Sequence, residues 1–338
     1  MEVQENVSLK RLNSFGIDVS AKYFVEISSV EDVRAFISES KFERLPKLIL
    51  GGGSNILLKN DFEGVILKVG FSGIQLERED EDHYYINVGA GENWHKLVVH
   101  CVDNGYAGIE NLSLIPGNVG AAPMQNIGAY GVEFKDVFES LEAIDVNSGE
   151  IRQFSIDECR FGYRESVFKN ELKGRYLISQ VTLRLSRIPV LNTSYGTLGQ
   201  ELDSMGVEDI TIGAISQAVI NIRSSKLPDP AEIGNAGSFF KNPIVSHEEF
   251  ERIKSEHSNV VSYPADNGIK LAAGWLIDYC GWKGKRVGDA GVHEKHALVL
   301  ANYGNASGSE IFEMSEEILD SVSTKFGITL EREVNVIS

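Results

Sequence analysis

The hydrophobic pattern of the first hundred residues switches between the helical and the extended period. Apolar residues recur every three to four positions over 30–37, directly after Ser29, and again over 94–102, before Gly105. Serine is a favourable helix N-cap and glycine a common helix stop, so both segments are predicted to be amphipathic helices. Short apolar runs predict strands at 48–50, 65–69 and 84–88. We therefore expect helices and strands to be interspersed in this half.

The pattern changes twice in the second half. Residues 137–187 are rich in strand signals, which lie at 141–146 and 176–185. Beyond about residue 205, helical spacing returns at 215–222, 271–280 and 311–326. The last helix is predicted to begin with a Ser307–Glu310 capping box and to stop at Gly327. This change predicts a second unit that begins near residue 216.

One segment fits neither period. Residues 111–132, NLSLIPGNVGAAPMQNIGAYGV, carry no charged side chain and four glycines. A long uncharged loop inside a compact domain is usually either functional or a wrongly assigned stretch of secondary structure. Small residues let a backbone approach a ligand closely, so we favour a ligand-binding loop here.

A second glycine-rich segment, GGGSN at 51–55, follows the predicted strand at 48–50. Consecutive backbone N–H groups at glycines can hold a pyrophosphate. The segment lacks the GxGxxG spacing and the Lys-Ser/Thr ending of a P-loop, and by itself it fits an ordinary turn equally well. Two uncharged glycine loops together, however, could hold a long, planar, anionic cofactor.

Charge narrows the choice of partners. The chain has 32 Lys and Arg against 49 Asp and Glu, a formal net charge of −17, which argues against binding to nucleic acid. An anionic substrate would need a local positive cluster. Candidate members are Arg160, Arg164, Arg223, Lys226 and Lys241. An isolated pair of arginines, such as the one in CRFGYRES, is more often a solvated surface pair.

Other residue patterns exclude several classes of protein. The three cysteines are an odd number and far apart, which argues against a disulfide framework, and the histidines lack metal-ligand spacing. No metal site is expected. No run of 18 apolar residues and no N-terminal apolar segment is present, so we expect no membrane span, no signal peptide and a cytoplasmic location.

Ser238 stands in AGSFF, which is not the GxSxG nucleophile elbow. From its local sequence alone, Ser238 is best interpreted as a turn residue. A hydroxyl can still deliver a proton where its surroundings assist.

Ordered motifs along nearly the whole chain resemble the UDP-N-acetylenolpyruvoylglucosamine reductase family in its longer form. They are NSFGID at 13–18, ILGGGSNILL at 49–58, VGAGENWHKLV at 88–98, IPGNVGAAPMQNIGAYGVE at 115–133, ECRFGYRES at 158–166, SYGTL at 194–198, KLPDP at 226–230, GNAGSFFKNP at 234–243, KLAAGWLID at 270–278, KHALVL at 295–300 and LEREV at 330–334.

The resemblance implies an α+β protein with the vanillyl-alcohol-oxidase/p-cresol-methylhydroxylase type of FAD-binding fold. It implies FAD-binding subdomains at 1–70 and 71–215, and a substrate-binding domain at 216–338 whose C-terminal segment returns to the active site. It also implies noncovalent FAD, with NADPH as reductant. The residues expected at the FAD are Gly51, Gly52, Gly53, Ser54, Asn55, Pro116, Gly117, Gly120, Ala121, Gln125, Asn126, Gly128 and Ala129.

The implied reaction reduces UDP-N-acetylglucosamine enolpyruvate to UDP-N-acetylmuramate in peptidoglycan precursor synthesis. Arg164 would stabilise the enolate, Glu333 would assist as a protonated donor, and Ser238 would protonate the carbanion. The residues implied at the substrate are Tyr130, Tyr195, Lys226, Asn242 and His296.

This sequence departs from the family's pattern at two of its motifs. Arg332 stands beside Glu333 where a proline is frequent, and His296 stands where some relatives carry glutamine.

The sequence supports three alternative functions less well. Another FAD oxidoreductase of this fold would often bind flavin covalently, but no His or Cys lies within 51–58 or 111–132. A nonenzymatic nucleotide-binding protein would not need the three reaction-centre residues, and a Rossmann dehydrogenase would need GxGxxG. We expect a monomer.

Overall fold

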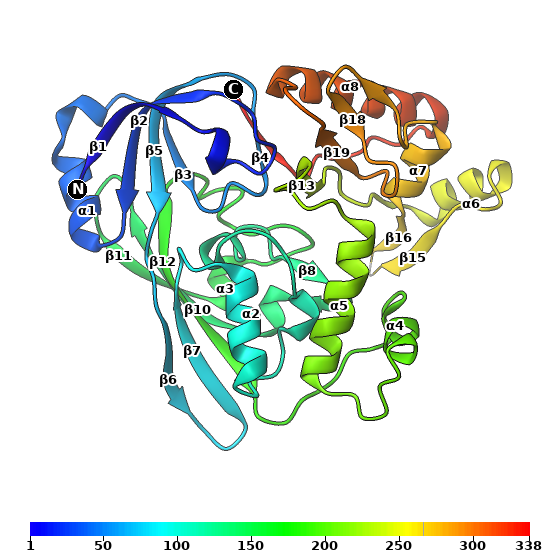
Figure 1. Cartoon of the computed structure of the whole chain (residues 1–338), viewed down its shortest axis with the longest axis horizontal. Coiled ribbons are helices and arrows are strands. Elements are labelled where there is room, and N and C mark those ends of the chain that lie inside the picture. Colours follow the sequence, from blue (N-terminus) through cyan, green and yellow to red (C-terminus); the bar gives the residue numbers. More distant parts are fainter. Residues whose placement is uncertain (266) are drawn as a thin grey trace. The chain divides into compact units, whose positions relative to one another are not determined.

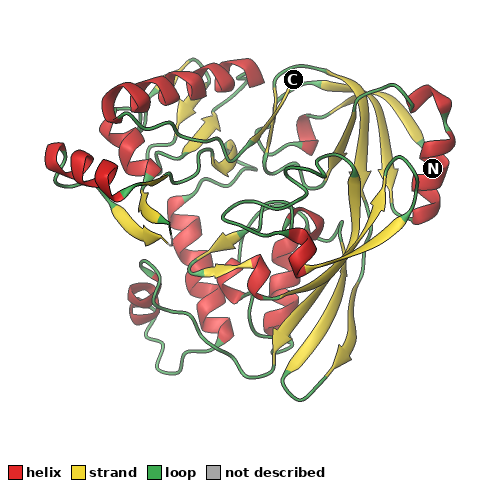
Figure 2. Cartoon of the chain, turned by 180° about the vertical axis from the view of Figure 1, so that it is seen from behind, coloured by secondary structure: helices red, strands yellow, loops and turns green. Residues whose placement is uncertain are grey.

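The structure is a computed structural model that describes residues 1–265 and 267–338. Its contacts divide the chain into two compact units. Unit 1 contains Met1–Val7, Ala21–Gly53 and Glu63–Ser225, and unit 2 contains Ser8–Ser20, Ser54–Phe62 and Lys226–Ser338. Helices and strands are interspersed in the first half, as the pattern predicted, and also beyond residue 205, where the pattern predicted only helices (Figures 1 and 2). The predicted domain boundaries at 70 and 215 remain a prediction.

The first sheet of unit 1 has four strands in the order β1-β2-β5-β3. They are β1 (Val3–Ser8), β2 (Ser20–Ile27), β3 (Lys47–Leu50) and β5 (Phe62–Val69). Helix α1 (Val30–Ser38) begins as predicted, with the Ser29 hydroxyl accepting a hydrogen bond from the Asp32 amide. Its buried Val33 and Phe36 belong to the same core as the strands of this sheet.

The second sheet of unit 1 is antiparallel, with the order β11-β10-β12-β7-β6. Its strands are β6 (Ile74–Glu79), β7 (His83–Gly89), β10 (Phe138–Asp145), β11 (Ile151–Ser155) and β12 (Tyr176–Ser186). The strands predicted near 84–88, 141–146 and 176–185 are thereby confirmed. Helix α2 (Trp94–Asp103) follows β7, and the short helix α3 (Ile156–Cys159) follows β11.

The uncharged segment 111–132 forms short pieces of structure. They are the 3-10 turns η3 (Glu110–Leu112) and η4 (Val119–Ala121) and the two-residue strands β8 (Gly128–Ala129) and β9 (Val132–Glu133). Helices α4 (Leu198–Ser204) and α5 (Ile212–Lys226) pack together through a separate apolar cluster that includes Leu198, Ile215 and Val219.

Unit 2 contains two small antiparallel sheets. The first has the order β13-β19-β18-β17 and the second the order β14-β16-β15. Their strands are β13 (Gly234–Ser238), β14 (Ile244–Val245), β15 (Ser262–Ala265), β16 (Gly268–Leu271), β17 (Arg286–Val287), β18 (Ala290–Val292) and β19 (Val299–Asn302). The helices are α6 (His247–Glu256), α7 (Ala273–Tyr279) and α8 (Gly308–Phe326).

Helix α8 confirms the predicted Ser307–Glu310 capping box and the stop at Gly327, which has φ +70°. The helix predicted over 271–280 is shorter, because Leu271 pairs with Ser262 in the small sheet.

Two early segments of the chain complete unit 2. Phe15, Ile17 and Leu57 are buried in its core, and β4 (Ile56–Leu58) pairs in parallel with β20 (Asn335–Ile337). A Cβ added at Gly234 would lie 2.2 Å from the Phe15 carbonyl oxygen, so only glycine fits there.

None of the helices in the described part of the chain has the length and apolar character needed to cross a bilayer.

Candidate functional site

The two glycine-rich loops meet in unit 1. A Cβ added at Gly52 would lie 2.6 Å from Asn118 Oδ1 and 2.9 Å from Gly117 Cα. Gly53 and Gly117 have φ angles of +66° and +116°, in the region that favours glycine. Gly52 is therefore required by the close approach of the two loops, and Gly53 and Gly117 are favoured by their backbone conformation.

Hydrogen bonds fix the second loop to the junction of β7 and α2. Val119 N donates to Glu92 O at 2.8 Å, and Gly120 N donates to Ala90 O at 2.9 Å. The Gly52 and Gly53 N–H groups, in contrast, donate to no protein acceptor within residues 1–265 and 267–338. Such unused donors on a rigid, uncharged loop fit a pyrophosphate, so these residues suit an FAD.

The polar atoms of the Asn126 side chain form hydrogen bonds with other protein groups. Its Nδ2 donates to Glu133 Oε2 and to Gly162 O, both at 3.0 Å, and its Oδ1 accepts from Lys135 N at 2.9 Å. The residue is fully buried at φ +44°. Any contact of Asn126 with a cofactor is therefore left to its backbone.

Arg164 lies against this loop. Its Nη2 donates to Gly128 O at 2.6 Å, and its Nη1 donates to Asn126 O at 3.5 Å. A Cβ at Gly128 would come within 3.1 Å of the guanidinium, so glycine leaves room for it. The predicted cofactor loop and the predicted enolate-stabilising arginine are thus in direct contact.

Arg223 interacts electrostatically with both Tyr130 and Arg164. Burial lowers the pKa of the Arg223 guanidinium. The charge of Arg164 lowers this pKa further, whereas Tyr130 raises it. Burial raises the pKa of Tyr130, which Arg223 lowers and Tyr195 raises. No carboxylate of the described residues forms an ion pair with Arg223, whose Nε donates to Leu114 O at 3.3 Å.

The sequence marks Arg223 as a positive charge without placing it at the site. Its helical position, three residues before Lys226, was the available signal. The neighbouring His95 has a lowered pKa because of burial and, secondarily, Arg223, and its Nδ1 accepts from Leu114 N at 3.0 Å.

Unit 2 brings Ser238 and Glu333 onto neighbouring segments. Phe240 and Arg332 form an antiparallel bridge, flanked by hydrogen bonds from Lys241 N to Glu331 O and from Glu333 N to Phe239 O, both 2.8 Å. Ser238 follows Gly237, whose φ is +70°, and pairs with Val299 of β19. The serine is thus both a turn neighbour and the last residue of a strand.

Three other predicted residues of unit 2 have structural partners. Asn55 Nδ2 donates to Glu333 O at 3.2 Å, and Asn242 Oδ1 accepts from Ala273 N at the start of α7 at 2.9 Å. His296 O accepts from Val299 N at 3.0 Å, in the turn before β19. The Asn55 side chain is therefore hydrogen-bonded to the Glu333 backbone.

The predicted residues are shared between the units as follows. Unit 1 contains Gly51, Gly52, Gly53, Pro116, Gly117, Gly120, Ala121, Gln125, Asn126, Gly128, Ala129, Tyr130, Arg164 and Tyr195. Unit 2 contains Ser54, Asn55, Lys226, Ser238, Asn242, His296 and Glu333.

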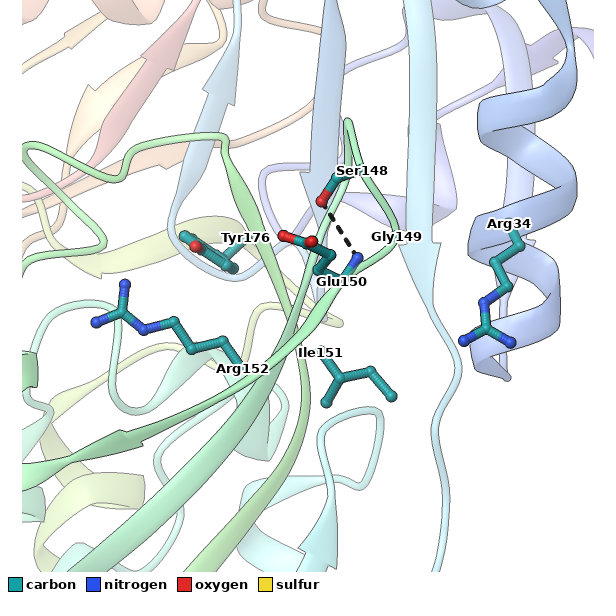
Figure 3. A pocket seen from close by; sticks show the side chains of 7 residues that line it. All are labelled: Arg34, Ser148, Gly149, Glu150, Ile151, Arg152 and Tyr176. Atoms are coloured by element: carbon teal, nitrogen blue, oxygen red, sulfur yellow. Dashed lines mark hydrogen bonds between the residues drawn. The ribbon is translucent and has the colours of Figure 1, made fainter.

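A hollow of about 690 Å³ elsewhere in unit 1 contains none of these residues (Figure 3). Its two arginines already pair with acids: Arg34 with Glu31 at 4.0 Å and Arg152 with Glu158 at 2.8 Å. The hollow is open and polar, and we assign it no function.

The chain is similar over its full length to curated bacterial enzymes. It is 50% identical to UDP-N-acetylenolpyruvoylglucosamine reductase of Pseudomonas syringae pv. syringae over 99% of both chains. The reductases of Amoebophilus asiaticus and Flavobacterium johnsoniae are 49% and 48% identical over 100% of both chains. The chain belongs to the UDP-N-acetylenolpyruvoylglucosamine reductase family. The resemblance seen in the sequence is confirmed.

Domain matches agree with this family. Residues 21–155 match an FAD binding domain, and residues 229–337 match the UDP-N-acetylenolpyruvoylglucosamine reductase, C-terminal domain.

Solved structures confirm the expected fold class. The reductase of Thermus caldophilus aligns with a TM-score of 0.70 at 23% identity over 100% of both chains. The 6-hydroxy-D-nicotine oxidase of Arthrobacter nicotinovorans aligns with a TM-score of 0.50 at 12% identity over 97% of this chain and 86% of that one. This chain therefore has an α+β fold of the vanillyl-alcohol-oxidase type.

Proposed function

We propose that this chain reduces UDP-N-acetylglucosamine enolpyruvate to UDP-N-acetylmuramate, with noncovalent FAD and with NADPH as reductant. The observation that carries the proposal is the 50% identity over 99% of both chains to a reductase of that name. The residues implied in the reaction are spread from 51 to 333, so a likeness over the whole length bears on all of them.

FAD, when bound, supplies the hydride chemistry between NADPH and the β-carbon of the enolpyruvyl group. Backbone groups of Gly51–Asn55 and of the loop from Pro116 to Ala129 hold it. Two features support this assignment: the contact between the loops, and the unused N–H groups of Gly52 and Gly53.

Arg164 stabilises the negative charge that develops on the substrate carboxylate and the neighbouring carbon. Ser238 gives a proton to that carbon. Glu333 assists in its protonated form, because an ionised carboxylate would repel the enolate. The contacts of Arg164 with Gly128 O and Asn126 O support its role, since they hold the guanidinium at the cofactor loop.

Tyr130, Tyr195, Lys226, Asn242 and His296 bind the nucleotide sugar. We add Arg223 to this group, because it is a positive charge close to Tyr130 that no acid neutralises among the described residues. In a chain with a net charge of −17, such a cluster is what an anionic substrate requires.

The enzyme acts in the cytoplasm as a monomer and binds neither nucleic acid nor membrane. Its acidity supports the absence of nucleic-acid binding. Sedimentation of the flavin-loaded protein at two concentrations tests the monomer, and a concentration-dependent mass would contradict it.

The test of function follows the flavin spectrum without oxygen. Purified protein should be yellow, and denaturation should release intact FAD. NADPH should bleach the flavin, and UDP-N-acetylglucosamine enolpyruvate should restore its colour with formation of UDP-N-acetylmuramate. A flavin that bleaches but is not restored by this substrate would indicate a different oxidoreductase of the same fold.

A further inference from the structure

The short segment that carries Glu333 has two distinct faces. Arg332 bridges to Phe240, whereas Glu331 lies opposite Lys241 and forms an ion pair with it at 2.5 Å. Successive side chains of an extended segment point to opposite faces. Arg332 therefore lies on the face opposite Glu331 and Glu333, and Leu330 and Val334 of the same segment are buried in the core of unit 2.

Arg332 reaches helix α8 from this face. Its Nε donates to Ser315 Oγ at 2.9 Å, and its Nη2 pairs with the Glu316 carboxylate. Its guanidinium lies 4.7 Å from the ring centre of Phe312. These three partners are at i, i+3 and i+4, so they form one surface of the helix.

The Ser315 hydroxyl is oriented for this contact. It donates to Phe312 O at 2.6 Å, which leaves its lone pairs for Arg332 Nε. A two-point contact of a planar guanidinium fixes both position and rotation, which a lysine ammonium cannot do. The Glu316 side chain is half exposed, so its charge alone contributes little.

We propose that Arg332 is a positioning residue for Glu333, acting by fixing the segment to α8. Because Arg332 and Glu333 are neighbours on opposite faces of the segment, a shift of Arg332 relative to α8 would move the backbone and turn the Glu333 carboxyl with it. Asn55 Nδ2 and Phe239 O hold the Glu333 main chain from two other sides, through its carbonyl oxygen and its amide. The proposal rests on the proposed function, in which Glu333 assists the second half-reaction.

The experiment compares Arg332→Lys and Arg332→Ala with wild type in stopped-flow half-reactions on the FAD-loaded enzyme. Reduction of the flavin by NADPH should be unchanged. Reoxidation by UDP-N-acetylglucosamine enolpyruvate should slow by roughly 10- to 100-fold in both variants, the range expected for a misplaced catalytic group. The pH profile of reoxidation should also shift, since the surroundings of the Glu333 carboxyl change.

Two control variants test whether the effect comes from the position of Arg332 and not from the Glu316 charge or from a loss of α8 stability. Glu316→Gln keeps an acceptor for Arg332 and should reoxidise at close to the wild-type rate. Arg252→Lys removes a second arginine contact of α8, in which Arg252 Nη2 donates to Phe326 O at 2.6 Å. This variant should affect neither half-reaction.

The outcomes are distinct. Equal slowing of both half-reactions, or wild-type reoxidation in a folded Arg332→Ala protein, would overturn the positioning role. Wild-type reoxidation in Glu333→Ala would instead overturn the proposed role of Glu333. If the substrate does not reoxidise the reduced flavin of the wild-type protein, the proposed function is wrong.

Discussion

Arg164 has a left-handed backbone, with φ +58°, and five of the six non-glycine residues with positive φ in the described chain lie between Leu114 and Arg164. Such a conformation costs roughly 1–2 kcal/mol per residue. Strained backbone tends to gather where side chains or carbonyl groups must be aimed at a ligand. Here it accompanies the contact of Arg164 with the Gly128 and Asn126 carbonyls.

Arg164→Lys should therefore not be a conservative change. Lysine cannot reach both carbonyls from a planar fork, so the charge would be displaced from the enolate. We expect reoxidation by the substrate to fall at least about 10-fold, consistent with the loss of an electrostatic donor, and flavin reduction to stay near wild type. Stopped-flow absorbance measures both. Reoxidation within a factor of about two of wild type would remove Arg164 from the reaction.

Ser238→Ala should separate the two half-reactions more sharply. The hydroxyl has no part in hydride transfer from NADPH, whereas a positioned proton donor contributes ~10²–10⁴-fold to the second step. Reduction should be unchanged, reoxidation should fall by that factor, and Ser238→Cys should recover part of the rate.

An alanine variant that reoxidises normally would leave Ser238 with only its structural place beside Gly237, at the end of β13. The proton would then come from solvent or from Glu333.

At the scale of elements, the contact between the two glycine loops predicts a defect in FAD binding. Gly52→Ala would place a methyl group 2.6 Å from Asn118 Oδ1 and 2.9 Å from the Gly117 backbone, so the loops must separate. We expect a roughly 10-fold or greater loss of FAD affinity, about 1.4 kcal/mol or more. Titration of the apoprotein by fluorescence measures it.

Gly213→Ala is the size-matched control. A Cβ at Gly213 has only ordinary contacts, at 3.7 Å and 3.9 Å, so this variant should bind FAD normally. If both variants bound FAD alike, the loop contact would be irrelevant to the cofactor.

Helix α2 predicts a pH dependence of stability through His95, which accepts the Leu114 amide at Nδ1. Burial and Arg223 lower its pKa in the folded state. As the pH falls below the unfolded value of about 6.5, the unfolded chain takes up a proton first, so stability is lost. Urea unfolding at pH 7.5 and pH 5.5 should show the fall, and His95→Gln should reduce it.

A residual slope is expected in His95→Gln because burial also lowers the pKa of His293. An unchanged slope in the variant would show that His95 titrates alike in both states.

The elements that the sequence predicted well are those with local signals. Ser29, the Ser307–Glu310 box and Gly327 mark the ends of α1 and α8 by hydrogen bonds within a few residues. The positive φ of Arg164 had no such signal, because tertiary contacts with Gly128 and Asn126 hold it. The sequence likewise contains no local signal for the hydrogen bonds of the Asn126 side-chain amide.

At the scale of the whole molecule, unit 2 is assembled from three separate stretches. Its core includes Phe15, Ile17 and Leu57, which are far from residues 226–338 in sequence. No hydrophobic periodicity within 8–20 or 54–62 predicts that these residues belong to unit 2. The change of pattern near 216 indicated a second unit but not these insertions. Such pairings are long-range, and a sequence read in local windows does not contain them.

A fragment of residues 226–338 should therefore fail to fold cooperatively. It lacks β4, which pairs with β20, and the Phe15 carbonyl and ring that pack against Gly234 and Phe239. We expect no sharp thermal transition by circular dichroism. A fragment in which residues 8–20 and 54–62 are joined to it by flexible linkers should regain one. A cooperative transition of the bare fragment would show that those stretches are dispensable.

The pairing of β20 with β4 also bears on biosynthesis. Residues 56–58 leave the ribosome long before residues 335–337 are made, a delay of roughly 15–55 s at ~5–20 residues per second. Phe15, Ile17 and Leu57 lack their core partners from residues 226–338 until that stretch is made, and β4 lacks β20 until residues 335–337 are made. Nascent chains of this enzyme should accordingly present a chaperone-binding stretch at residues 15–57, and full release of that chaperone should wait for residues 335–337, which pair with β4, to emerge.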